Sequence, residues 1–204
     1  MSTEELFIAE IDYDEARVTA DLMSYFQDLA FTIDALDRLQ QMINDNVQDS
    51  VLSGSLWIAA LVSYARCFST GKRFGLSGEM FQSIEGGLEC HEYYMNLRNK
   101  HIAHSVNPFE QVVVGLMLSP PSNAEKKVEG ISVLSQRLLH LDSEGIQNLR
   151  RLSLTTLKIV EKQGKESQDK ALEAGKKLPL DSLYAKAHPR TVTPGPEQAS
   201  KARR

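Results

Sequence analysis

The stretch from about Tyr13 to Asn44 constrains the fold of this chain most, because it contains neither glycine nor proline. Apolar side chains recur in it at alternating spacings of three and four residues, which is the period of one face of an α-helix. Gln40 is the one polar residue on this stripe, which is formed by Leu22, Phe26, Leu29, Ile33, Leu36 and Ile43. The pattern predicts a long amphipathic helix whose stripe packs against a core or against another subunit.

Two more long helices and one short helix are predicted before residue 105. The segment from about Leu56 to Phe68 is apolar nearly all round, which is typical of a helix in the centre of a bundle. The polar residues 44–55 separate it from the first helix. A third long helix is expected from about Leu88 to His104, with a short helix before it near Gly78 to Ile84.

The period then changes to two. Residues 110–118 alternate in the manner of a strand, residues 119–123 form a loop rich in Pro and Ser, and residues 128–134 form the returning strand. Gly130 is the expected position of a bulge. We therefore predict a β-hairpin at about 110–135, inserted in a helical protein.

The last helix begins at Asp142 or Ser143, either of which is a good cap. From about Lys176 the chain is rich in Pro, Lys and Arg and has little to bury, so a disordered basic tail is expected over 176–204. Residues 1–175 then form one domain, as the length of 204 residues allows. The predicted fold class is mainly α, a bundle of up-and-down helices with an inserted hairpin.

Composition narrows the functional classes. No apolar run approaches the roughly 20 residues of a membrane helix, and the acidic N-terminus lacks the features of a signal peptide, so we expect a cytoplasmic protein without a membrane segment. The two cysteines, Cys67 and Cys90, are expected to be buried thiols. Because the net charge is −4, any nucleic-acid site must be a local basic patch.

One segment, residues 91–105, concentrates the groups that can do chemistry: an arginine, a lysine and three histidines. In it Arg98 and Asn99 are followed, after a gap of five residues, by His104, which the small Ala103 precedes. This pattern resembles the motif of the HEPN superfamily, in which an Arg and a polar residue are followed by a His after four to six residues. The resemblance spans about residues 13–165, with its sequence detail confined to the second and third helices.

The resemblance implies a helical ribonuclease that needs no metal and no cofactor, with Arg98 and His104 as catalytic residues and single-stranded RNA as substrate. A role in stress or phage defence is also implied. The residue types suit this chemistry. The planar guanidinium of arginine holds two phosphate oxygens, and the near-neutral pKa of histidine lets it accept or donate a proton. The attacking group is the 2′-hydroxyl of the RNA itself.

Helix geometry adds a condition. A spacing of six residues turns His104 about 120° away from Arg98 on a regular α-helix. In HEPN relatives a two-fold dimer brings two motifs into one cleft, so a homodimer is implied, formed through the stripe of the first helix or the face of the third. The expected substrate-binding residues are Asn99, Lys100, His101, Tyr94 and Arg66. Among them His101 is expected to contact phosphate, Tyr94 to stack on a base, and Arg66 to border the cleft.

Alternatives remain open. Glu92 and Glu110 are possible ion-pair partners for Arg98, and His104 can cap carbonyls at a helix end. In HEPN toxins that are regulated by a nucleotidyltransferase antitoxin, a Tyr stands two residues after the motif His, where this chain has Val106, so such a partner is not supported.

Three rival interpretations follow from the same segment. One is a non-catalytic RNA- or nucleotide-binding module, and another is a structural helical dimer. The third is a zinc site on His101 and His104, for which Cys90 and His91 would be the other candidate ligands. Cys90 is about three turns away on the same helix, which disfavours the metal site.

Overall fold

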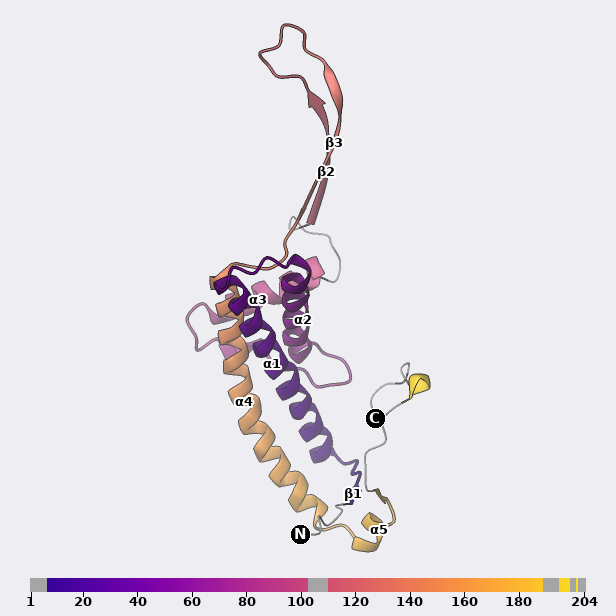
Figure 1. Ribbon diagram of the computed structural model, residues 1–204. Coiled ribbons are helices and arrows are strands. Elements are labelled where there is room, and N and C mark those ends of the chain that lie inside the picture. Colours follow the sequence, from indigo (N-terminus) through magenta and orange to yellow (C-terminus); the bar gives the residue numbers. More distant parts are fainter. Residues whose placement is uncertain (1–6, 103–109, 189–194, 199–200, 202–204) are drawn as a thin grey trace.

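A computed structural model describes residues 7–102, 110–188, 195–198 and 201. As predicted, the chain is mainly helical (Figure 1). Helices α1 (Asp14–Asn44), α2 (Ser50–Phe68) and α4 (Ser143–Gly175) run along one another, and α3 (Gly87–Leu97) lies across the end where α1 and α2 are joined. A short 3₁₀ helix, η1 (Gly78–Phe81), precedes α3 near the predicted position.

Helix α1 packs antiparallel to α2 and to α4. On α1, Thr32 donates a hydrogen bond to the carbonyl of Ala60 on α2, at 3.3 Å. At the opposite face of α1, Arg150 of α4 pairs with the Asp37 carboxylate. Because α2 and α4 cover α1 from two sides, its buried surface is broader than the single stripe we predicted. Tyr25 is fully buried, whereas Phe26, which belonged to the predicted stripe, lies at the outer margin and is 36% exposed.

Helix α2 begins at Ser50, six residues before the predicted start. Asp49 caps it, because its carboxylate accepts a hydrogen bond from the backbone N–H of Leu52 at 2.8 Å. Gly54, which suggested a loop, instead lies buried inside the helix, where a Cβ atom would meet Leu139 at 3.8 Å. By length and composition α2 is apolar enough to cross a membrane, but core helices of soluble proteins meet the same test, and Trp57 and Leu61 of α2 are fully buried in the bundle.

The predicted hairpin is confirmed. Strands β2 (Glu110–Leu118) and β3 (Val128–Arg137) pair antiparallel and extend away from the end of the bundle (Figure 1). Met117 pairs with Gly130 but Leu118 pairs with Val128, so Glu129 is an extra residue and forms a bulge next to the expected glycine.

The C-terminal region differs from the prediction of a tail that is disordered from about residue 176. It contains a short helix, α5 (Leu180–Tyr184), a two-residue strand, β4 (Ala187–His188), and a 3₁₀ turn, η3 (Pro196–Gln198). Strand β4 pairs with β1 (Ile8–Ala9) at the far end of the bundle. This contact joins segments from the two ends of the sequence, so local composition could not reveal it.

Candidate functional site

The segment that carries the HEPN-like motif follows directly from α3. The α-helix ends at Leu97, and residues Arg98–Ile102 continue it as a π-helical turn, η2. A π-turn holds more residues than an α-helical turn, so the offset of about 120° expected for a regular α-helix between positions 98 and 104 does not apply here. Residues 103–109, and with them His104, lie outside the described part of the chain.

Arg98 is half-buried at this junction. Its Nη1 donates a hydrogen bond to Oδ1 of Asn99 at 2.9 Å. Within the described residues no ion pair joins Arg98 to Glu92, one of the two carboxylates considered for it. The side chain of the other, Glu110, is not described. The guanidinium of Arg98 therefore keeps donors that a phosphate can use, since a neutral amide oxygen occupies only one of them.

Asn99 and Lys100 are both exposed on the π-turn. Together with Arg98 they place two cationic groups and one amide at the end of α3. The side chain of His101 lies outside the part of the chain that the structure describes. Three of the predicted site residues are thus adjacent at one position in the fold.

Tyr94 is a correction to the predicted substrate site. Its side chain is 2% exposed, its hydroxyl donates a hydrogen bond to the carbonyl of Gly145 at 2.5 Å, and its ring meets Trp57 edge-on at 6.5 Å between centroids. A ring buried in this way cannot stack on a base. The tyrosine instead fixes α3 against α2 and the start of α4, and burial raises the pKa of its hydroxyl.

His91, one turn earlier on α3, is also a core residue. Its Nδ1 lies 2.8 Å from the hydroxyl of Tyr64. The rings of Phe68 and Phe81 pack against the imidazole, with their centroids 4.5 and 5.1 Å from its centroid. Desolvation lowers the pKa of His91 to about 4, so the imidazole is neutral at physiological pH. Among the described residues no three His, Cys, Asp or Glu side chains converge as metal ligands.

Arg66 does not border the same site within one chain. Tyr64 meets His91 in the first half of α3, whereas Trp57 meets Tyr94, one turn before Arg98, so α2 and α3 run antiparallel. Arg66 therefore lies about 13 Å along α2 from the level of Trp57. There its Nη1 pairs with the Asp28 carboxylate of α1 at 3.5 Å.

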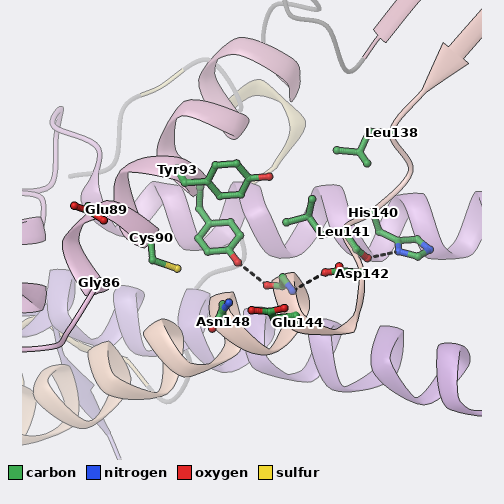
Figure 2. A pocket seen from close by; sticks show the side chains of 12 residues that line it. Gly86, Glu89, Cys90, Tyr93, Leu138, His140, Leu141, Asp142, Glu144 and Asn148 are labelled. Atoms are coloured by element: carbon green, nitrogen blue, oxygen red, sulfur yellow. Dashed lines mark hydrogen bonds between the residues drawn. The ribbon is translucent and has the colours of Figure 1, made fainter.

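A hollow of about 620 Å³ lies between α3 and the start of α4 (Figure 2). Its lining includes three carboxylates, those of Glu89, Asp142 and Glu144, with Tyr93 and His140 beside them. This charge repels phosphate, and Arg98 is not part of the lining. Local sequence patterns do not indicate this hollow, because its residues come from two segments about 50 positions apart.

A second, smaller hollow of about 340 Å³ lies where the loop after α2 meets the start of α1. It is lined by both signs of charge: Asp14, Arg17, Asp21, Lys72 and Arg73 are its charged residues. Arg73 is bound to Asp28 at 3.0 Å and stacks on Tyr25 at 4.8 Å, so this cation has a structural role.

Comparison of the chain with models of known protein families, with characterised proteins and with solved structures found no significant match.

Proposed function

We propose that this protein is a metal-independent endoribonuclease of the HEPN type, which cleaves single-stranded RNA and acts as a homodimer in the cytoplasm during stress or phage defence. The observation that carries the proposal is the position of Arg98: a half-buried arginine, without a carboxylate partner among the described residues, on a π-turn at a helix end. Turns of this kind are rare in proteins, and many of those that occur lie at functional sites.

In the proposed reaction the 2′-oxygen of a ribose attacks the neighbouring phosphorus atom. The bond from phosphorus to the 5′-oxygen breaks, and the products are a 2′,3′-cyclic phosphate and a 5′-hydroxyl. One proton leaves the 2′-hydroxyl and one joins the 5′-oxygen. His104 is assigned to this proton transfer, a role worth about 10²–10⁴ in rate.

Arg98 is assigned to the phosphate. Its free donors can bind two nonbridging oxygens and stabilise the charge that grows on them in the transition state. Asn99 and Lys100 are exposed beside it and are suited to the sugar–phosphate backbone. Contacts of this type give affinity without base specificity.

The test is cleavage of end-labelled single-stranded RNA in EDTA by the wild type and by the variants Arg98→Ala and His104→Ala. We expect cyclic phosphate ends from the wild type and a loss of about 100-fold or more in each variant. Arg38→Ala is the matched control, because Arg38 is an exposed arginine on α1 whose guanidinium donates a hydrogen bond to the side-chain oxygen of Gln41.

Two results would count against the enzyme. Cleavage that persists in both variants would point to a contaminating nuclease, and a broad RNA panel left intact by the wild type would remove the catalytic assignment. If fluorescence anisotropy then showed RNA binding that depends on Arg98 but not on Arg38, the protein would be a binding module that uses the same site.

A further inference from the structure

The β2–β3 hairpin has one strongly apolar face that no described residue outside the hairpin covers. Paired residues of the two strands share a face, and the register is Val114 with Val133 and Leu116 with Ile131. The side chains of this face, here called the apolar face, are between 57% and 68% exposed. They are Val112, Val114, Leu116, Leu118, Val128, Ile131 and Val133.

The opposite face of the hairpin is different in kind. Gly115 pairs there with Ser132, Met117 pairs with Gly130, and Gln111 pairs with Gln136. Small and polar residues thus alternate with the apolar positions Val113 and Leu134. A two-stranded sheet with one aliphatic face and one mixed face is built to pack on one side and to meet water on the other.

The exposed aliphatic surface is comparable in size to the largest apolar patch of a typical monomer. The transfer free energy of an aliphatic side chain, divided by the transfer free energy per unit of apolar area, gives the apolar area of that side chain. Scaled by their exposed fractions, the seven residues expose on the order of 400 Å² of apolar area. That lies within the roughly 300–600 Å² of the largest patches on monomers, which are often functional. It is also about half of the roughly 800 Å² that each partner contributes to a standard interface. An isolated two-stranded hairpin is itself marginally stable in water, so packing on this face also stabilises the hairpin.

Three observations favour a second copy of the chain as the partner. The seven side chains of the apolar face are uncharged, and the two charged residues on the same side of the hairpin, Glu110 and Arg137, have opposite charges and stand opposite each other at the end next to the bundle. The face can therefore meet itself without net like-charge repulsion, although the chain as a whole has a net charge of −4. The β2 edge has neither charge nor proline from Gln111 to Leu118, so it is unprotected against pairing. Neither strand contains an aromatic residue, whereas segments that bind lipid surfaces usually place Trp or Phe at the interface.

The surfaces that the sequence offered for a dimer are not available. The stripe of α1 is covered by α2 and α4, and the face of α3 that carries His91, Tyr94 and Leu97 is buried. The hairpin is the apolar surface that extends furthest from the bundle (Figure 1). The size of the exposed apolar face and the burial of these helical surfaces therefore both favour the hairpin as the dimer contact.

We propose that two copies of this chain form a dimer in which the apolar faces of their hairpins pack against each other around a two-fold axis, as the two layers of a four-stranded sandwich. Stacked sheets of this kind lie about 10 Å apart, with their inner side chains interdigitated. A face that meets itself satisfies the condition for an isologous interface. This proposal does not depend on ribonuclease activity.

The test is sedimentation equilibrium of the full chain up to about 100 µM, with a matched pair of variants. Val114→Lys places a charge on the apolar face, and Val113→Lys places the same charge one residue away on the opposite face. We expect the wild type to reach twice the chain mass of 22.8 kDa. Val114→Lys should weaken association at least about tenfold, because a lysine would be buried without a partner, and Val113→Lys should change it about twofold or less.

Far-UV circular dichroism should show the same helix content in all three proteins, so that unfolding is not mistaken for dissociation. A wild type that remains monomeric over the whole range overturns the proposal, as does equal weakening by the two lysines. Flotation with vesicles of equal parts phosphatidylcholine and phosphatidylglycerol is the second measurement. Vesicle binding that Val114→Lys alone abolishes would assign the face to lipid and overturn the dimer.

Discussion

Lowering the pH from about 7 to about 5 is expected to destabilise this protein through one side chain, His91. The imidazole is 7% exposed, is enclosed by Phe68 and Phe81, and contacts the Tyr64 hydroxyl. Burial lowers the pKa of His91 from 6.5 to about 4 in the folded state. In the unfolded chain the same group is hydrated and takes up a proton near pH 6.5.

The direction in which stability changes with pH follows from proton binding. Between about pH 6.5 and pH 4 the unfolded state binds more protons at this position than the folded state, so stability rises with pH and is lost as the pH falls. At about 1.4 kcal/mol per pH unit of full linkage, His91 should cost about 2 kcal/mol between pH 7 and pH 5. The full loss, below the folded pKa, is about 3 kcal/mol.

The measurement is urea unfolding at a series of pH values, for the wild type and for the double variant Tyr64→Phe/His91→Phe. The double variant keeps two aromatic rings at this position, removes the titrating group, and leaves no buried hydroxyl without its partner. We expect its unfolding free energy to fall by about 2 kcal/mol less than that of the wild type between about pH 7 and pH 5.

Equal pH dependence in the two proteins would refute the reasoning, because carboxylates and the remaining histidines are common to both. Titration of His91 by NMR gives an independent check. A measured pKa near 6.5 would mean that water reaches the imidazole and that the aromatic enclosure is open.

Two further predictions concern the fold. Asp142→Ala should lower the unfolding free energy by about 1 kcal/mol, because the Asp142 carboxylate accepts a hydrogen bond from the N–H of Gly145 at the start of α4; in urea denaturation the exposed Asp169→Ala, inside the same helix, should not destabilise. Replacement of residues 110–137 by a short Gly-Ser linker should change Tm by about 3 °C or less at a concentration where the protein is monomeric, since the hairpin extends away from the helices (Figure 1). A clearly larger fall in Tm, or a loss of helix content in circular dichroism, would show that the helices need the hairpin.

Local sequence signals accounted for most of the elements. The helix over residues 14–44, the hairpin with its bulge beside Gly130, and the cap at Asp142 all follow from period and turn chemistry that a few neighbouring residues carry. The start of α2 was missed, because the run Ser53, Gly54 and Ser55 suggests a loop. Tertiary packing overrides that preference, since Gly54 lies buried within the helix next to Leu139.

For the candidate site, the sequence determined the motif and its residue types, and it placed Arg98, Asn99 and Lys100 at the end of a helix. Only the tertiary structure decided which members of the segment reach solvent. The periodicity of α3 does not distinguish a ring that faces a cleft from one that faces the core, and Tyr94 and His91 prove to be core residues held by Gly145 and Tyr64. The π-turn at Arg98 is likewise a departure from α-helical geometry that residue spacing does not reveal.

The sequence by itself also determined that the hairpin alternates between an aliphatic face and a mixed face, because side-chain direction in a strand has a period of two. That pattern predicts burial of the aliphatic face. The tertiary structure decided that the bundle does not provide this burial, since α1, α2 and α4 cover one another and leave the hairpin outside (Figure 1). Burial depends on which surfaces meet in space, and a one-dimensional pattern does not contain that information.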